Sequence, residues 1–340
     1  MFEPAWPFLA DDVNRDVINR DYIKAPACRD PRLFQVLTLG ILLTIGACYR
    51  DFSLRREQVI LTFLAAIATQ ALTGLRRRNS SPQGINSARP TGCVVGAGLA
   101  PRFASNAAYL SVLITSLSVA ILLRADNLWA HPAAAVTAIA SKSVIRFRAK
   151  HLFNPANLGV MLGLLLLPGT WVSAGQWGND LALAGWFMML GAVVVNRARR
   201  GDVSWTFLAF YLGALAARVM WLGQNPAVWT HQLENGALLL FAFFMISDPR
   251  TAPDHPRGRI AQAALVAAIA YVWQFELYRT NALLWALFLA TPAVPFWDAI
   301  WPARRFEWNS KGGHDEAKLE TLSCVCSHAA DRHSRRGHAA

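Results

Sequence analysis

The sequence predicts an all-α protein that crosses a membrane about ten times, and three observations lead to this prediction. The chain of 340 residues is 54% hydrophobic and only 16% charged, whereas soluble proteins contain about 25% charged residues. Its apolar residues gather in runs of about 15 to 19 residues, close to the length of a transmembrane helix. Arginine and lysine concentrate in every second loop between these runs.

The net charge of +12 does not indicate a nucleic-acid-binding protein. Such binding requires basic side chains on one face of a folded domain. Here the arginines lie in loops between apolar runs instead. We therefore expect the lipid bilayer, and no nucleic acid, as a partner.

The first half of the chain contains five apolar runs that hydropathy identifies as spans. They occupy residues 33–49, 59–75, 107–123, 128–145 and 158–172. A polar segment, 1–32, precedes them and is expected in the cytoplasm. Residues 79–104 are rich in glycine, proline, serine and arginine, so we expect a cytoplasmic loop there.

The second half contains five further runs, followed by a polar tail at 301–340 that we expect to be cytoplasmic and disordered. The runs occupy residues 181–195, 205–222, 233–246, 260–275 and 282–300. Several runs are nearer 15 than 20 residues, which is typical of spans that are short or broken beside a cavity. The cysteines and histidines of the tail match no closed tetrahedral zinc site, so no metal is predicted.

Basic residues mark one side of the membrane as cytoplasmic. With the N-terminus inside, the cytoplasmic loops carry Arg76, Arg77, Arg78, Arg89, Arg102, Arg146, Arg148, Lys150, Arg197, Arg199, Arg200, Arg250, Arg257 and Arg259. The outer loops "VSAGQWGND" and "GQNPAVWTHQ" contain none, although the first outer loop departs from the rule with Arg50, Arg55 and Arg56. The pattern predicts a multi-pass protein of the bacterial inner membrane with both termini in the cytoplasm.

Few ionisable residues interrupt the apolar runs, and such residues are costly inside a bilayer. Arg218 and Glu234 lie near outer helix ends, where they either pair across a hairpin or extend to the interface. Lys142 lies one turn from a cytoplasmic helix end and is expected to extend to the interface likewise. No chain of buried carboxylates crosses the membrane, which disfavours a proton relay within this chain.

Three polar segments at helix ends are the candidate functional shell. Their residues are Asn154, Pro155 and Asn157, then Asp248, Pro249 and Thr251, and finally Asn281. Each segment places a carboxamide or carboxylate beside unpaired backbone groups that can grip a ligand. The alternative is ordinary turn and cap chemistry, and the residue types alone leave both interpretations open. No residue qualifies by spacing as a nucleophile, acid or base, so no catalytic residue is assigned and enzymatic activity stays undecided.

These segments resemble the RnfD and NqrB membrane subunits of the Rnf and sodium-pumping NADH:quinone oxidoreductase complexes. "HLFNPANLG" is similar to that family's Phe-Asn-Pro-Ala turn, and "FFMISDPRTAP" is similar to its Met-Ala-Thr-Asp-Pro-Val-Thr-x-Pro segment. "TNALLWALFLATPAVPFWD" is similar to its closing Met-Asn-Ala segment, which ends in Pro-x-x-Asp. The resemblance covers roughly residues 31–298 and is nearest to the UnbU branch, which is associated with enediyne biosynthesis.

The resemblance implies a ten-helix subunit of two inverted five-helix repeats that binds flavin and passes electrons within a complex of membrane or redox subunits. The family attaches FMN to the threonine of a Ser-Gly-Ala-Thr motif in the outer loop after span five. Here that loop reads "GTWVSAGQWGNDL" and lacks the motif, so the attachment site is not transferred to Thr170. We therefore expect a non-covalent flavin, FMN or riboflavin, rather than covalent FMN.

Other functions remain open on the same fold. A flavin ring requires flat aromatic walls and amide partners, and candidates by residue type are Trp171, Trp177, Trp186, Asn157 and Asn235. The simpler interpretation of the tryptophans is an aromatic belt at the membrane surface. The alternatives are a channel or transporter for a small molecule or ion, and an accessory membrane protein of enediyne-type natural-product biosynthesis.

An internal match supports the inverted repeat. "FNPANLGVMLGLLLLP" and "LYRTNALLWALFLATP" align without gaps, which places Asn157 on Asn281 and Pro168 on Pro292. The first stretch enters the membrane from the cytoplasm and the second from outside, as an inverted repeat requires. We expect each asparagine to cap a short helix that faces a shared polar interior, and each proline to end that helix.

Overall fold

The computed structural model describes residues 31–49, 52–79, 100–147, 150–172, 177, 181–303 and 306. Contacts divide the chain into the unit Met1–Pro302 and the unit Ala303–Ala340, and the fold described below is that of the first. The expected N-terminal segment, the centre of the 79–104 loop and almost all of the 301–340 tail lie outside the described residues.

The prediction of an all-α polytopic membrane protein is confirmed, because each expected apolar run contains a helix. The first half forms α2 (Pro31–Tyr49), α3 (Arg56–Asn79), α4 (Ala100–Leu122), α5 (Ala130–Val144) and α6 (Pro155–Leu166). A helix satisfies its own backbone polar groups, as a lipid environment requires. Because α4 begins at Ala100, it includes the last residues of the segment that was expected to be a loop.

The second half contains the more interrupted helices. It forms α7 (Leu181–Arg197), α8 (Gly201–Trp221), α9 (Ala227–Leu233), α10 (Gly236–Leu240), α11 (Pro256–Tyr271), α12 (Ala282–Ala290) and α13 (Val294–Ile300). The π-helix η2 (Phe241–Met245) continues α10, the π-helix η3 (Val272–Glu276) continues α11, and the 3-10 turn η4 (Thr291–Ala293) links α12 to α13. Segments of π-helix are rare and occur frequently at functional sites.

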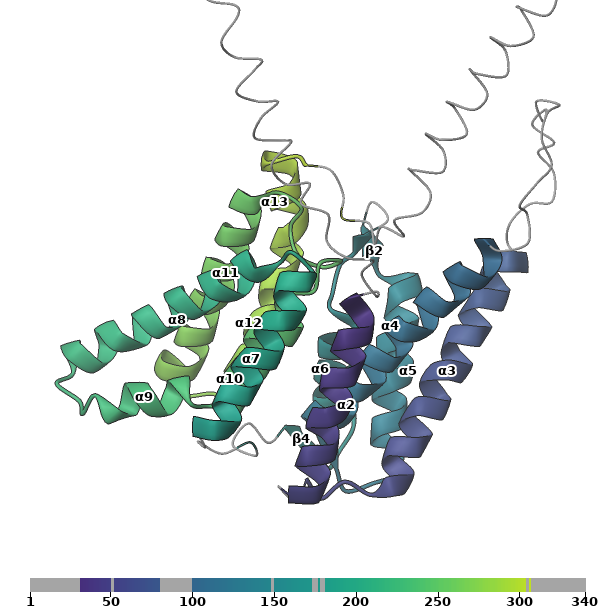
Figure 1. Cartoon of the computed structure of the whole chain (residues 1–340), viewed down its shortest axis with the longest axis horizontal. Helices are drawn as coiled ribbons and strands as arrows, with labels where there is room; N and C mark the ends of the chain where they lie inside the picture. The colour runs from purple at the N-terminus through teal and green to yellow at the C-terminus, as the bar shows by residue number, and fades with distance from the viewer. Residues whose placement is uncertain are drawn as a thin grey trace, which may run out of the picture. The chain divides into compact units, whose positions relative to one another are not determined.

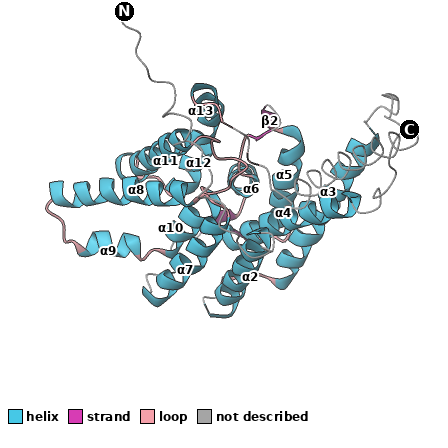
Figure 2. Cartoon of the chain, turned by 45° about the horizontal axis from the view of Figure 1, so that its top comes forward, coloured by secondary structure: helices cyan, strands magenta, loops and turns pink. Residues whose placement is uncertain are grey.

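Two short antiparallel ribbons join the helix ends. At one end of the bundle β1 (Leu123–Ala125) pairs with β4 (Thr170–Val172), and at the other β2 (Arg146–Phe147) pairs with β3 (Lys150–His151). Figure 1 shows β2 near the end that carries α13, so we name the two ends the α13 end and the β4 end. Figures 1 and 2 both place α6 between the group of α3, α4 and α5 and the group of α8, α9 and α11.

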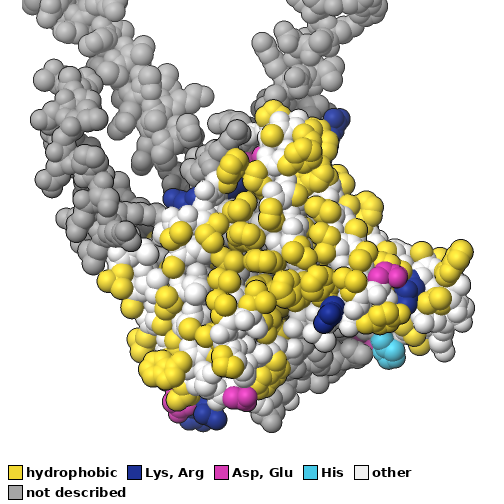
Figure 3. Space-filling model, turned by 180° about the vertical axis from the view of Figure 1, so that it is seen from behind, with side chains coloured by type: hydrophobic (Ala, Val, Ile, Leu, Met, Phe, Trp, Pro, Cys, Tyr) yellow, Lys and Arg dark blue, Asp and Glu magenta, His cyan; other side chains and the backbone are white. Residues whose placement is uncertain are grey.

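The surface agrees with a membrane environment. Among the described residues, four helical stretches are long and apolar enough to cross a membrane, namely Arg32–Tyr49, Arg56–Gly74, Gly201–Trp221 and the continuous α12–η4–α13 stretch Ala282–Ile300. Shorter apolar helices accompany them, including Pro155–Leu166 and Gly236–Met245. Figure 3 shows hydrophobic side chains over most of one face, where charged side chains are few. Exposed apolar residues such as Leu37, Leu64 and Phe210 are therefore suited to contact lipid.

A buried arginine closes the β4 end. Arg124 donates to the carbonyl oxygens of Ala120, Ile121 and Leu123, and its guanidinium carbon lies 4.5 Å from the centre of the Phe52 ring. Burial lowers the pKa of Arg124 to about 10, so the group stays protonated at neutral pH. The guanidinium thus neutralises the carbonyl-rich end of α4, as a cation at a helix C-terminus should.

Candidate functional site where α6 meets η2 and α12

The Asn-Pro-Ala-Asn segment is the start of α6. Asn154 is the N-cap, and its Oδ1 accepts a hydrogen bond of 3.2 Å from the backbone N–H of Asn157. Pro155 takes the first helical position, where its fixed φ suits the helix. Its missing N–H costs no hydrogen bond there, because an N–H at this position has no partner within the helix. Cap chemistry therefore explains why an apolar helix opens with these residues.

The same carboxamides also tie α6 to the second half of the chain. Asn154 Nδ2 donates to the Met245 carbonyl, at the end of η2, and Asn157 Nδ2 donates to the Leu284 carbonyl in the first turn of α12, both at 3.2 Å. Both asparagines are buried, and Asn157 is only 2% exposed. Its Oδ1 has no hydrogen-bond partner, so the junction holds an enclosed acceptor that lacks a donor.

The second predicted segment forms a tight turn directly after η2. Asp248 Oδ1 accepts from the backbone N–H of Arg250 at 3.1 Å, and the Asp248 carbonyl accepts from the backbone N–H of Thr251 at 3.2 Å. Pro249 is buried, and Thr251 is 8% exposed. Burial raises the pKa of Asp248 above its ordinary value, although the Arg250 amide and the charges of Arg250 and Lys142 oppose this.

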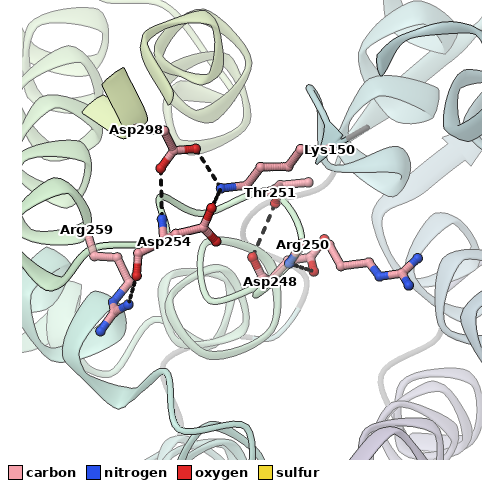
Figure 4. A network of polar contacts seen from close by, with 7 residues as sticks. All are labelled: Lys150, Asp248, Arg250, Thr251, Asp254, Arg259 and Asp298. Carbon is pink, nitrogen blue, oxygen red and sulfur yellow. Dashed lines mark hydrogen bonds and ion pairs between the residues drawn. The ribbon is translucent and has the colours of Figure 1, made fainter. Parts of the chain in front are cut away.

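An ion cluster joins all three predicted segments at the α13 end (Figure 4). Lys150 Nζ lies 2.8 Å from Asp298 Oδ2 and 3.2 Å from Asp254 Oδ2. The backbone N–H of Asp254 donates to Asp298 Oδ1 at 2.9 Å. Asp298 ends one of the segments recognised in the sequence and Asp254 directly follows another, but neither was predicted as a site residue. The sequence did contain a signal for this cluster, because each of the three segments has one residue of the cluster in it or beside it: Lys150, Asp254 or Asp298.

Arg259 extends this cluster toward α8. Its Nε lies 2.6 Å from Asp202 Oδ2 and its Nη1 donates to the Asp254 carbonyl at 2.8 Å. Burial lowers the pKa of the neighbouring Arg200, as does the charge of Arg259, whereas Asp202 and two further aspartates raise it. Figure 4 shows Asp254 with Lys150 on one side and Arg259 on the other, so the turn after η2 is held by charges from both sides.

Comparison with known proteins places this site in a recognised family. Residues 106–307, which are more than half of the chain, match the family described as NQR2, RnfD, RnfE. The chain belongs to this family. The match starts within α4 and extends past α13, so every predicted site residue and the ion cluster of Lys150 lie inside the NQR2/RnfD/RnfE region.

Two curated relatives show how far this chain has diverged within the NQR2/RnfD/RnfE family. The chain is 27% identical over 154 residues to a protein of Haemophilus influenzae that is named as a subunit of the ion-translocating oxidoreductase complex, and the alignment covers 45% of this chain and 42% of that protein. It is 30% identical over 141 residues to the protein of the same name from Yersinia pestis, which covers 41% of this chain and 38% of that protein. The alignments thus span about two fifths of these relatives.

The internal match agrees with the ends of the two helices but not with their starts. Helix α6 ends at Leu166 and α12 at Ala290, which is the same separation as that between Asn157 and Asn281. The expectation that Asn157 caps α6 is wrong, because the cap is Asn154 and Asn157 lies in the first turn. The caps also differ, because Asn281 has a left-handed backbone (φ 59°) and its side chain makes no capping bond. Pro168 follows the end of α6 as expected, but Pro292 lies in η4 and the chain continues into α13.

The predicted residues nevertheless converge around one helix start. The first turn of α12, which Asn281 opens, contains Leu284, and the Leu284 carbonyl is the acceptor for Asn157. Met245, the acceptor for Asn154, precedes the Asp248 turn by three residues. The two carboxamides of α6 therefore connect the other two segments, and Asn281 takes part through the position of its backbone at the start of α12.

The tryptophan candidates are not assembled at this junction. Trp177 is buried, with ring centres 4.8 Å from Phe52 and 4.7 Å from Phe187, and is thus part of the packed core. Trp171 and Trp186 are exposed. Asn235 caps α10 through its Oδ1. The aromatic pair that does lie at the start of α6 is Phe153 stacked on Phe288, at 5.1 Å.

One alternative for Arg218 and Glu234 is excluded, and the expectation for Lys142 is corrected. Arg218 pairs with Glu276 at 3.7 Å, and Glu234 lies 3.9 Å from His231, so the Arg218–Glu234 pair does not form. Lys142 does not extend to the interface but donates into α4. The two outcomes differ in cause, because Arg218 of α8 pairs with η3, which is not its hairpin neighbour, whereas Lys142 of α5 bonds to the preceding helix α4.

Proposed function

We propose that this chain is a membrane subunit that takes part in flavin-linked electron transfer within a larger complex. Membership of the NQR2/RnfD/RnfE family supports this proposal, as do relatives named as subunits of an ion-translocating oxidoreductase complex. Other membrane or redox subunits are then its partners. We place the chain on the UnbU branch of the family on the strength of its sequence motifs.

The observation that carries the proposal is the unpaired Asn157 Oδ1 between α6 and α12. A buried carboxamide oxygen without a donor is costly unless a ligand or water supplies one. The isoalloxazine ring of a flavin has an imide N–H flanked by two carbonyl groups, so its edge matches a carboxamide. When bound, a flavin accepts and gives electrons singly or in pairs.

The remaining predicted residues surround this acceptor and would shape the site. Asn154 and Pro155 fix the start of α6, Asp248, Pro249 and Thr251 form the turn after η2, and Asn281 opens α12. The bound flavin is FMN or riboflavin, held without a covalent bond. In support, the Thr170 hydroxyl donates to the carbonyls of Gly163 and Leu167 and belongs to no Ser-Gly-Ala-Thr string.

We further propose that the α13 end faces the cytoplasm of a bacterial cell and that both termini lie there. The basic residues Arg146 and Lys150 and the segment 197–200 lie at this end, as the distribution of basic residues in membrane proteins leads us to expect.

A transporter or channel is the second candidate function. Short helices that start or end inside a bundle, as α6 and the α10–η2 segment do, build substrate sites in many transporters. The closed contacts of Asn154 and Asn157 would then form one side of a gate. Uptake of a solute by proteoliposomes without any redox partner would favour this function.

The test of the flavin proposal is the absorbance of detergent-purified protein before and after acid precipitation. We expect flavin absorbance that moves entirely to the supernatant, and flavin fluorescence on the protein band of a denaturing gel would contradict the non-covalent assignment. The variant N157L should lose flavin several-fold. The matched variant N235A removes another capping carboxamide, far along the chain from α6, and should retain it.

A further inference from the structure

Lys142 is a partly buried lysine whose ammonium group donates to neutral oxygens. It lies in the last turn of α5, and its Nζ donates to the Ser111 carbonyl at 3.1 Å, to Ser111 Oγ at 3.1 Å and to Thr115 Oγ1 at 2.9 Å. An ammonium group has three donors, so all three are satisfied by α4. In the part of the chain that the structure describes, no carboxylate forms an ion pair with it.

The oxygens around this ammonium group are those that proteins use for small hard cations. Carbonyl and hydroxyl oxygens replace the hydration shell of such ions, and several neutral dipoles together can hold a full positive charge. Thr115 Oγ1 turns its own proton to the Ser111 carbonyl, at 2.8 Å, which leaves its lone pairs directed at Lys142. Ser111 and Thr115 are one helical turn apart, so the spacing of α4 itself creates the pair of hydroxyls.

The position is also electrostatically connected to the candidate site. The charge of Lys142 acts on Asp248, the carboxylate of the turn after η2. A charged residue inside a membrane protein is costly and is therefore a functional candidate unless it extends to the interface. Lys142 points into α4 instead, so extension to the interface does not explain it.

We propose that the ammonium group of Lys142 is a built-in cation that occupies a position between α4 and α5 suited to a monovalent alkali ion such as Na⁺. The lysine thereby supplies a positive charge at this position, and this charge acts on the Asp248 carboxylate as a bound ion would. The inference concerns charge inside the subunit and does not depend on the flavin proposal.

Removal of the side chain provides the test. The variant K142A removes the charge and leaves room, so Na⁺ with its waters should enter the oxygen-lined position. Purified K142A in detergent should unfold at a temperature higher by roughly 2–4 °C in NaCl than in choline chloride of equal concentration, with a saturable dependence on Na⁺. The wild-type protein should show no difference between the two salts.

Two controls separate ion binding from loss of a lysine. The variant K142M also removes the charge but fills the space with an unbranched chain, so it should show no preference for NaCl. The double variant K142A/T115V lacks one oxygen ligand and should lose most of the Na⁺ effect. Equal unfolding temperatures of K142A in NaCl and choline chloride would overturn the proposal.

A second variant covers the case in which K142A cannot be purified. K142S offers one more hydroxyl oxygen to an ion and is measured in the same salts. If neither variant folds in NaCl, or if both fold without responding to it, the position does not accept Na⁺ and the proposal is wrong. Flavin content is measured on the same samples, so a failure of the flavin proposal remains distinguishable.

Discussion

Replacement of Lys150 by methionine should strongly destabilise the α13 end. Lys150 contacts Asp298 at 2.8 Å and Asp254 at 3.2 Å, and the three side chains are 16%, 23% and 8% exposed. Removal of one partner from a buried ion pair costs about 3–5 kcal/mol. Because these groups retain some contact with solvent, we expect a loss of roughly 2–3 kcal/mol for K150M.

The assay is unfolding of the detergent-purified protein by a denaturing detergent, followed by tryptophan fluorescence. The loss arises from two carboxylates that are left facing each other, so D254N and D298N introduced together into K150M should restore at least half of it. The control R250M removes an exposed basic residue from the turn after η2 and should change the free energy of unfolding by less than about 0.5 kcal/mol. A K150M protein as stable as R250M, or no recovery in the triple variant, would refute the reasoning.

Three further predictions address the pH response, the helix packing and the orientation. The folded protein raises the pKa of Asp248 above its ordinary value of 3.8, so it favours the protonated carboxyl group. The stability that this contributes is complete below pH 3.8 and is lost as the pH rises through the pKa of the folded protein. The free energy of unfolding of the wild type, relative to that of D248N, should therefore fall on titration upward from about pH 4. A Cβ at Gly159 would lie 2.5 Å from a carbonyl oxygen of α5, so G159A should cost about 1–3 kcal/mol in the same unfolding assay, whereas G185A, with open space around it, should be neutral or stabilising. Reporter fusions at Arg257 should be cytoplasmic and those at Gly223 external, and exchanged signals would contradict the orientation.

The fold was predictable because membrane spans depend on local composition. Apolar runs and the arginines between them located a helix in every expected span without knowledge of tertiary contacts, but not α9, which lies in the expected outer loop "GQNPAVWTHQ". The irregular features were not predictable in this way. The π-helical turns η2 and η3 and the short ribbons form where packing overrides local preference, and Phe243 in η2 packs against Gly191, where a Cβ would lie only 2.6 Å away.

The candidate site was predictable in its residues but not in its connections. Asparagine beside proline marks a helix start, and Asn154 and Pro155 are indeed that start. Each carboxamide donates to a backbone carbonyl about 90 to 130 residues away in the sequence. These partners are set by helix packing, so they could not be predicted from the spacing of residues in the sequence. For the same reason the pairing of Lys150 with Asp254 and Asp298 was missed, whereas the error over the cap of α6, which is Asn154 and not Asn157, was a local one.

The distribution of charge limits what the junction can do. Among the described residues, the charged groups near the site lie at or toward the α13 end, as Lys142, Lys150 and Asp248 do, whereas α6, η2 and α12 meet through carboxamides and backbone carbonyls. A carboxamide is neutral at any physiological pH and cannot carry a proton by ionising. Such groups can bind and orient a polar ring, and their dipoles can favour one charge state of it. Under the proposed function, a proton coupled to electron flow must therefore cross elsewhere, either beside the charges of the α13 end or in a neighbouring subunit, while the Asn154 and Asn157 junction holds the redox group.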